Sequence, residues 1–142
     1  MSTTTLKSKD EAIQSLTKSD LYGFIGDDIR YMHPLNRKVI YTPGVRHVAY
    51  AGKAYWLIDA IASYFGSSIM DEAMAKDSRI KSLQFWRLKV TDGKATLTAV
   101  ADQGCEPFIT QEFEYTDFPL DEIDIWAGFD GSLWTLYLPS EH

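Results

Sequence analysis

Cysteine is nearly absent from this 142-residue chain, which contains one, Cys105. A single cysteine cannot form a disulfide within the chain, and this suits a reducing cytoplasm. Long apolar runs are also missing, because no stretch approaches the roughly 20 residues that a membrane-spanning helix needs. The first residues, MSTTTLKSKDEAIQSL, contain no apolar core of a signal peptide. We therefore expect a cytoplasmic protein, folded as one domain over residues 1–142.

Basic residues are missing from the last third of the chain. Residues 1–94 hold all 14 Lys and Arg with 10 acids, a balance of +4, whereas residues 95–142 hold the other 10 acids, a balance of −10. Direct binding of nucleic acid is not expected, because phosphate neutralisation needs clustered Lys or Arg. Three explanations of the asymmetry stay open: attraction between the two halves within the fold, a solvated acidic face, or an acidic surface for a basic partner.

The short motifs that mark common catalytic and metal sites are absent too. The three histidines, His33, His47 and His142, match no zinc-binding spacing. Neither of the glycine-rich phosphate-binding loops occurs, and the G-x-S-x-G motif is missing as well. We therefore predict no catalytic residue, no metal site and no cofactor. The sequence gives little support for an enzyme.

What the sequence does contain is a series of helices followed by a series of strands. Ser8-Lys9-Asp10-Glu11 has the form of a capping box, which predicts a short helix through about Lys18. A Pro43-Gly44 turn joins predicted strands at 38–42 and 45–50, and helices follow at about 52–65 and at 68–77. Asp92-Gly93 predicts a hairpin between strands at 83–91 and 94–100. Further strands are expected at 108–115, 123–129 and 133–138, the last two around Asp130-Gly131.

This order predicts an α+β fold. Hairpin-linked strands form an antiparallel sheet, and the principal helix (about 52–65) and the shorter helices pack on one face of it. Alternation along the strand at 108–115 places Glu112 and Glu114 on a side that water or a partner reaches. Asp124 is expected on such a side of the strand at 123–129. Glu112, Glu114 and Asp124 are therefore predicted to bind a basic partner.

The principal helix has two distinct sides. A helical wheel gives a core stripe that includes Leu57, Ile58 and Ile61, and an opposite side made of Tyr55, Trp56, Asp59 and Ser63. A solvated helix face normally carries Lys, Glu or Gln, so this aromatic face needs a covering layer or a partner. Three interpretations stay open. A loop or the sheet covers the face and Asp59 accepts structural hydrogen bonds, or the face is a homodimer interface, or it is a binding site formed by Tyr55, Trp56 and Asp59.

Several stretches resemble a family of small, functionally uncharacterised bacterial proteins that are common on plasmids, prophages and other mobile DNA. The similarity covers residues 23–141 in one order and lies in HPL (33–35), YTPGV (41–45), YWLIDAIA (55–62), FWRL (85–88), ATLT (95–98), YTDFPLDE (115–122) and LPSE (138–141). Pro43 departs from the family, which has T-D-G at that turn. The resemblance implies no activity, ligand or catalytic residue. Residence on mobile DNA implies a role in element maintenance or in antagonising host defence.

Two functional hypotheses follow. The leading one is a non-enzymatic protein-interaction or inhibitor module, which binds a basic or nucleic-acid-binding protein through the acidic C-terminal sheet region or the Trp56 face. The alternative is a small-ligand-binding or enzymatic domain in which Asp59, His33 and nearby tyrosines converge. Homodimerisation through Trp56 is compatible with both. The alternative requires that Asp59 line a cavity with a second titratable group within hydrogen-bond reach.

Overall fold

A computed structural model of the protein describes residues 16–17, 21, 23 and 29–142. The helix predicted from the capping box, Ser8 to about Lys18, lies almost entirely outside these residues. Within them, no helix is both long enough and apolar enough to cross a membrane.

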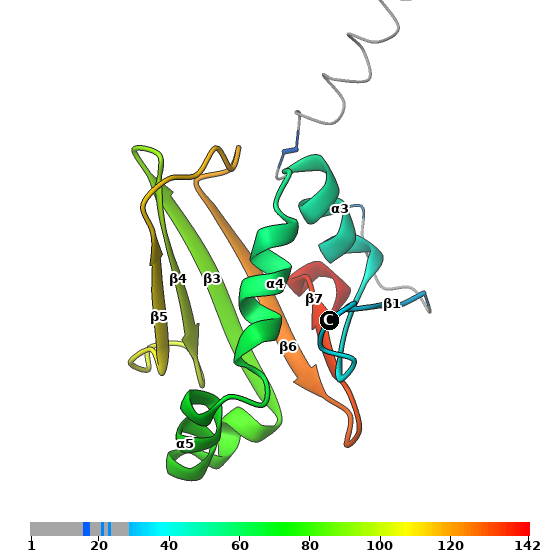
Figure 1. The fold of residues 1–142 in the computed structure, drawn as a ribbon, viewed down its shortest axis with the longest axis vertical. Helices are drawn as coiled ribbons and strands as arrows, with labels where there is room; N and C mark the ends of the chain where they lie inside the picture. The colour runs from blue at the N-terminus through cyan, green and yellow to red at the C-terminus, as the bar shows by residue number, and fades with distance from the viewer. Residues whose placement is uncertain (1–15, 18–20, 22, 24–28) are drawn as a thin grey trace, which may run out of the picture.

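Seven strands form one sheet in the order β1-β2-β7-β6-β3-β4-β5 (Figure 1). Every neighbouring pair is antiparallel except β2 and β7, which run parallel. The α+β class is therefore confirmed, and the predicted antiparallel pairing is wrong for this one pair, whose strands come from distant parts of the sequence. The strands are β1 (Tyr31–Met32), β2 (Val39–Tyr41), β3 (Leu83–Thr91), β4 (Lys94–Val100), β5 (Ile109–Phe113), β6 (Glu122–Phe129) and β7 (Trp134–Tyr137).

Turn residues close both predicted hairpins. Asp92 and Gly93 have positive φ angles, 53° and 75°, and form the two-residue turn between β3 and β4. Between β6 and β7, the Asp130 carboxylate accepts the N–H groups of Leu133 (2.7 Å) and Ser132 (2.8 Å). These hydrogen bonds lower the pKa of the Asp130 carboxyl, because they favour its charged form.

The principal helix, α4, spans Tyr55–Tyr64 and is shorter than the predicted 52–65. Its first predicted residues instead form the turn from the preceding helix. Gly66 follows α4 with a φ of +93°, the left-handed conformation that glycine adopts without steric cost. The next helix, α5 (Ser68–Lys76), is capped by Ser67, whose side chain accepts the Met70 N–H.

The segment after β2 is a helix and not the predicted strand at 45–50. This helix, α3, spans Pro43–Ala51. Thr42 caps it by accepting the Val45 N–H at 3.3 Å, and proline suits the first helical turn, where its missing N–H has no partner to lose. The alternation that predicted a strand is compatible with a helix, because Val45 and Ala49 satisfy both periods. The buried residues have helical spacing: Val45, Val48 and Ala49.

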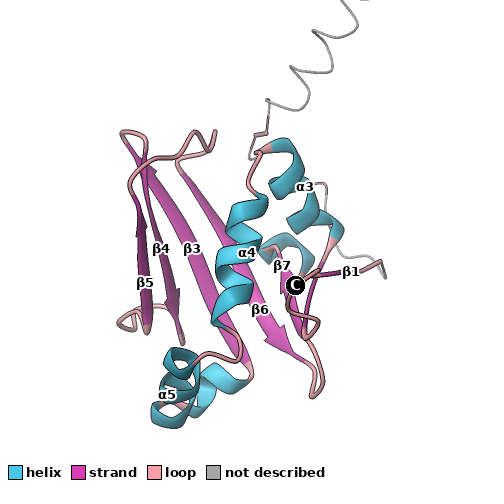
Figure 2. Ribbon diagram, viewed as in Figure 1, coloured by secondary structure: helices cyan, strands magenta, loops and turns pink. Residues whose placement is uncertain are grey.

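Helices α3 and α4 lie on one face of the sheet (Figure 2), whereas on the opposite face only the 3-10 helix η2 and Leu21, among the described residues, border the strands. The strands alternate accordingly. On β3, Trp86 and Leu88 are buried on the helix side, whereas Phe85 and Arg87 point to the opposite side. We call that opposite side the open face.

The C-terminus is fastened to α3. Two short 3-10 helices, η1 (Ser78–Lys81) and η2 (Pro139–Glu141), flank the strands. The Glu141 carboxylate accepts hydrogen bonds from Thr42 Oγ1 at 2.6 Å and from the Gly44 N–H at 3.3 Å. A Cβ at Gly44 would lie 2.6 Å from Glu141 Oε1, so the close approach depends on glycine. Glu141 thus places a carboxylate at the N-terminus of α3, where the helix dipole favours negative charge.

Candidate functional site

The residues of the aromatic face predicted on α4 contact two different parts of the structure, the sheet and the loop between β1 and β2. Trp56 packs on Phe113 of β5 with ring centroids 4.9 Å apart, and its side chain is half-buried. The sheet therefore covers part of Trp56, which agrees with the interpretation of a covering layer. Homodimerisation through Trp56 stays a prediction.

Asp59 faces the loop between β1 and β2 instead. His33 Nε2 lies 2.8 Å from Asp59 Oδ1. The His33 side chain is 4% exposed, whereas that of Asp59 is 61% exposed. The structure thus supplies the second titratable group of the alternative hypothesis, in a contact between residues 26 positions apart in the chain. The hollows found in the described part of the chain do not include Asp59 in their lining, so the required cavity is not shown.

Backbone contacts fix the tautomer of His33. Its Nδ1 accepts the N–H groups of Leu35 (3.2 Å) and Asn36 (2.9 Å), so the proton of the neutral ring sits on Nε2. The imidazole therefore donates and the carboxylate accepts. Within the described residues, no hydrogen bond is made to the second carboxylate oxygen of Asp59.

Tyr41 connects this pair to two further tyrosines and an arginine. Tyr31 and Tyr41 stack with centroids 5.6 Å apart, and the Arg46 guanidinium carbon lies 5.0 Å from the centre of the Tyr31 ring. Burial raises the pKa of the Tyr41 hydroxyl, Tyr55 and Asp59 add to the rise, and Arg46 opposes it. We define the Asp59 cluster as Tyr31, His33, Tyr41, Arg46, Tyr55 and Asp59.

Asp124 lies on the open face, away from the Asp59 cluster. Arg87, directly opposite in the register, donates to both carboxylate oxygens of Asp124, at 2.6 and 3.2 Å. Glu122 lies 3.4 Å from the same guanidinium. Asp124 is the main cause of a raised pKa of Arg87, and Glu122 adds to it. The basic and acidic parts of the sequence therefore meet within the fold at this place, as the first explanation of the charge asymmetry expected.

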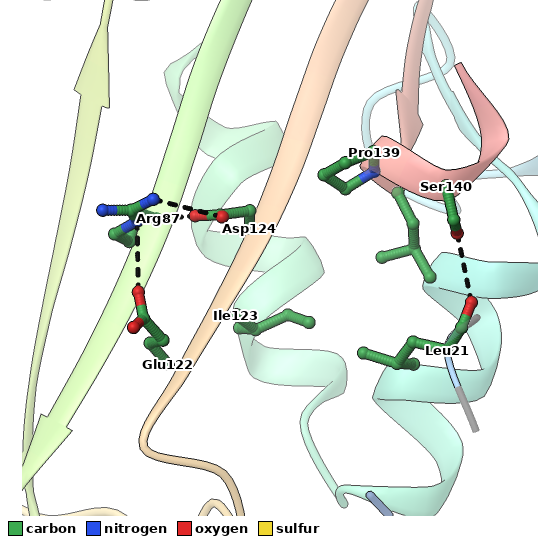
Figure 3. A pocket seen from close by; sticks show the side chains of 8 residues that line it. Leu21, Arg87, Glu122, Ile123, Asp124, Pro139 and Ser140 are labelled. Carbon is green, nitrogen blue, oxygen red and sulfur yellow. Dashed lines mark hydrogen bonds and ion pairs between the residues drawn. The ribbon is translucent and has the colours of Figure 1, made fainter. Parts of the chain in front are cut away.

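Two hollows adjoin on the open face. The first, of about 350 Å³, lies between β6 and η2 and includes Glu122 and Ser140 in its lining (Figure 3). The second, of about 370 Å³, extends across β3 and β4. Arg87, Asp124 and Pro139 line both hollows, so the open face is concave around the Arg87–Asp124 ion pair.

Aromatic side chains continue along the open face beside these hollows. Phe85 and Trp126 meet edge to face with centroids 5.1 Å apart, and Trp126 meets Tyr137 in the same way at 6.1 Å. His142 stacks on Tyr137 at 5.7 Å. We call Phe85, Trp126, Tyr137 and His142 the aromatic row. Its first three members are half-buried, so each ring still presents surface to solvent.

Glu112 and Glu114 lie at the edge of the sheet, on β5 and directly after it. Glu112 pairs with Thr96 in the register, which places it on the open face. Both glutamates are exposed, and no ion pair in the described part of the chain includes them. They line a broad depression together with Lys89 and Lys94 of the neighbouring hairpin. This surface therefore carries both signs of charge.

The residues predicted to bind a partner thus fall into three groups. Tyr55 and Asp59 belong to the Asp59 cluster, Asp124 lies in the concave part of the open face, and the third group lies around β5. That group contains Trp56, Glu112 and Glu114.

Sequence analysis did not select Phe85, Arg87 or Tyr137. Alternation along β3 carries a signal for the first two, since Trp86 and Leu88 are apolar and their neighbours then face the other way. No local signal shows which side of a strand a distant helix will cover. The open face could be recognised only from the packing of α3 and α4.

Metal binding has little support within the described residues, where no group of three or more His, Cys, Asp or Glu side chains is arranged to hold an ion. Cys105 contacts Arg79, whose Nη2 lies 3.6 Å from its Sγ and 2.7 Å from an oxygen of Asp77. The hydrogen bond to Arg79 lowers the pKa of the Asp77 carboxyl.

Comparison with known proteins gives a family but no activity. A family model described as "Family of unknown function (DUF6876)" matches residues 15–142. No curated protein matches the chain. A crystal structure of a protein of unknown function from Enterococcus faecalis is similar at 22% sequence identity, covering 82% of this chain and 93% of that chain, with a TM-score of 0.49.

Proposed function

We propose that this chain, which belongs to DUF6876, a family of unknown function, is a non-enzymatic module that binds a basic protein on the open face of its sheet. One observation carries the proposal. The open face is concave and presents the aromatic row beside the Arg87–Asp124 ion pair. On a sheet face that contacts only water, the side chains are usually polar.

The aromatic row has the chemistry of an interface core. Tryptophan and tyrosine are enriched where proteins meet, because they bury large areas while keeping a polar group for a hydrogen bond. Trp126 lies in the middle of the row, between Phe85 and Tyr137. A partner that covers Trp126 would remove the half-exposed rings from water, and this supplies the hydrophobic part of the binding free energy.

The charges around the row favour a basic partner. The adjoining hollows contain two carboxylates, Glu122 and Asp124, and one guanidinium, Arg87. Glu112 adds a carboxylate further along the same face, where Lys89 and Lys94 also lie. Residues 95–142, which supply all of these acids, contain no Lys or Arg. Complementary charge speeds association, and its effect weakens with salt.

The resemblance to proteins of plasmids and prophages supports a role in element maintenance or in antagonising host defence. Proteins that bind nucleic acid carry clustered Lys and Arg. A basic surface of that kind is the partner chemistry that an acidic, aromatic face would accept. The proposed role is therefore inhibition or recruitment of a nucleic-acid-binding protein.

The alternative function around Asp59 is favoured by the hydrogen bond from His33. The geometry supports binding there more than catalysis. In catalytic His–carboxylate pairs the imidazole faces the substrate and the carboxylate orients it. Here the imidazole is buried, its second nitrogen accepts backbone N–H groups, and the carboxylate is the exposed member.

Capture experiments with matched variants test the proposed function. Wild-type protein, Trp126→Ala and Tyr115→Ala are immobilised and exposed to a lysate of the native host at low salt. Tyr115 is the control because its side chain is 80% exposed and lies beyond the end of β5. We expect a basic protein to be recovered by wild type and Tyr115→Ala, and about tenfold less of it by Trp126→Ala.

Salt and charge provide the second arm of this test. Raising the ionic strength from about 0.1 M to 1 M shortens the Debye length from about 10 Å to 3 Å, so recovery should fall. Reversing charge at Glu112 and Glu114 should lower it as well. Failure to recover a basic protein at low salt, or equal recovery by all variants, would contradict the proposed function.

A further inference from the structure

We infer that the Asp59 cluster is a separate binding site for a cationic nitrogen group, an ammonium or a guanidinium, with Asp59 as its ligand and Tyr55 beside it. The site lies on the helix side of the sheet, whereas the proposed protein-binding surface is the open face. The inference therefore does not depend on the proposed function. It follows from the orientation, the charge and the aromatic surroundings of Asp59.

The orientation of Asp59 is set before any ligand arrives. A surface aspartate ordinarily rotates freely, and binding then has to restrict its side chain. Here one carboxylate oxygen is held at 2.8 Å by the Nε2 of His33, which is itself buried. The other oxygen belongs to a side chain that is 61% exposed. Such an arrangement presents a fixed acceptor to solvent.

The hydrogen bond is not needed to anchor the loop that carries His33. The Asn36 side chain donates to the carbonyls of Ala62 and Phe65, both at 3.0 Å, and so fastens the loop to the end of α4. The His33 N–H donates to the Val39 carbonyl at 2.9 Å. Asp59 thus serves as the acceptor that the buried Nε2–H of His33 needs, and other contacts hold the loop in place.

The described residues do not pair the charge of Asp59 with a lysine or an arginine. His33 donates as a neutral ring, because its Nδ1 is occupied by two backbone N–H groups. In the described part of the chain, no Lys or Arg forms an ion pair with Asp59. Arg46, the nearby arginine, lies over the Tyr31 ring instead. A carboxylate in this state binds cationic donors with charge-assisted hydrogen bonds.

The aromatic residues of the cluster suit the same kind of ligand. Tyr55 stands one turn before Asp59 on α4, on the same side of the helix, and is 43% exposed. Aromatic faces attract cations, and the cluster already contains one such contact, between Arg46 and Tyr31 at 5.0 Å.

Titration with small cations tests the site directly. The probes are Nα-acetyl-lysine methylamide and Nα-acetyl-arginine methylamide, with Nα-acetyl-norleucine methylamide as the neutral control. NMR follows the carboxyl carbon of Asp59 and the ring of Tyr55. We expect saturable shifts at both residues with the two cations and none with the norleucine compound. Equal shifts with all three probes, or shifts shared evenly by every exposed carboxylate, would overturn the inference.

Matched substitutions identify the ligand group. Asp59→Asn keeps an oxygen that can accept from His33 Nε2 and removes the charge, and we expect it to weaken binding of the lysine probe about tenfold or more. Asp71→Asn is the control, because Asp71 is also an exposed aspartate on a helix. Its affinity for the probe should equal that of wild type. Equal affinity of wild type and Asp59→Asn would contradict the site.

Two further measurements complete the test. The imidazole ¹⁵N signals of His33 in wild type should show the Nε2–H tautomer, and the lysine probe should shift Nε2 while leaving Nδ1 unchanged; movement of neither would count against the site without any variant. A short lysine-rich peptide separates the two sources of the cation. Tighter binding of the peptide than of the single lysine probe, with both weakened in Asp59→Asn, indicates a protein ligand. Equal affinity of the peptide and the single probe indicates a free amine.

Discussion

Trp86 and Trp126 lie on neighbouring strands of one sheet but on opposite faces. Trp86 is 1% exposed, and its Nε1 donates to Gln84 Oε1 at 3.0 Å. Trp126 lies on the open face, half-buried between Phe85 and Tyr137. The two residues show that aromatic content does not distinguish core from surface in this fold. Helices cover the face that contains Trp86, whereas Trp126 belongs to the aromatic row on the open face.

The largest change in the free energy of unfolding is expected when Trp86 is replaced by alanine, and Trp126→Ala gives the matched comparison. We expect Trp86→Ala to lower the free energy of unfolding by about 3–5 kcal/mol, because it opens a cavity and leaves Gln84 without its donor. Trp126→Ala should cost about 1–2 kcal/mol, since part of its ring is already hydrated. Urea unfolding followed by circular dichroism measures both values. Similar losses would contradict the assignment of the two faces.

Gln84 sharpens the contrast, because it is a polar residue in the covered face. Its Nε2 donates to the Ile80 carbonyl and its Oε1 accepts from Trp86, both at 3.0 Å. We expect Gln84→Leu to cost about 2–3 kcal/mol, because it leaves two buried groups unpaired.

Gln111→Leu is the matched control for this change. Gln111 accepts the Tyr64 hydroxyl at 2.7 Å but is half-exposed, so water can replace it and the cost should stay below about 1 kcal/mol. Thermal unfolding of the two variants compares them, and an equal shift in Tm would count against the buried network.

Substitution of Glu141 tests how strongly the C-terminus is held at the start of α3. We expect Glu141→Ala to lower the free energy of unfolding by about 1–2 kcal/mol, because Thr42 Oγ1 and the Gly44 N–H lose their acceptor at the start of α3. Ser140→Ala, which removes an exposed hydroxyl, should be nearly neutral. Guanidinium unfolding distinguishes them, and a neutral Glu141→Ala would show that the cap contributes nothing.

We expect alkaline pH to lower the stability of the fold by ionising one tyrosine on each face of the sheet. Burial raises the pKa of Tyr64 on the helix side and of Tyr137 on the open face. A hydroxyl whose pKa is raised on folding stabilises the fold fully below its unfolded value, about 10, and this stabilisation is lost as the pH rises through the folded value. Urea unfolding between about pH 8 and pH 11 should therefore show falling stability above pH 10. Tyr64→Phe and Tyr137→Phe should each reduce that fall, and an unchanged slope in both would contradict the expectation.

The smallest effect is expected from the ion pair on the open face. Arg87→Met removes both contacts to Asp124, but the groups are partly exposed, so the cost should be below about 1 kcal/mol and should shrink in 1 M salt. Lys89→Met, on the same side of β3, is the control. A loss as large as that of Trp86→Ala would mean that the open face holds the fold together.

Local patterns in the sequence predicted most of the fold and missed what depends on distant contacts. The Asp92-Gly93 turn, the helix that contains Leu57 and Ile61, and the acidic outer side of β5 are visible within short windows. The parallel pairing of β2 with β7 is not, because their alignment depends on the whole sheet. Helix α3 is not predicted, because Val45 and Ala49 fit two periods and Pro43-Gly44 is typical of a turn, whereas in the structure Pro43 begins the helix that Thr42 caps.

The site was predictable to a similar degree. Asp59 was selected for its odd place on an aromatic helix face, and His33 was named with it in the alternative hypothesis. Their hydrogen bond depends on how the loop after β1 meets α4, which no local pattern specifies. The ion pair of Asp124 with Arg87 likewise requires the register of β3 against β6.

Site-specific photo-crosslinking in the native host tests the central claim, binding of a basic protein on the open face. A benzophenone amino acid is placed at Gln103, an exposed residue at the rim of the second hollow, and at Ala75, an exposed residue of α5, as control. We predict a covalent adduct with a basic protein from position 103, reduced by Trp126→Ala, and none from position 75. Adducts from position 75 alone, or from neither position, would contradict the account.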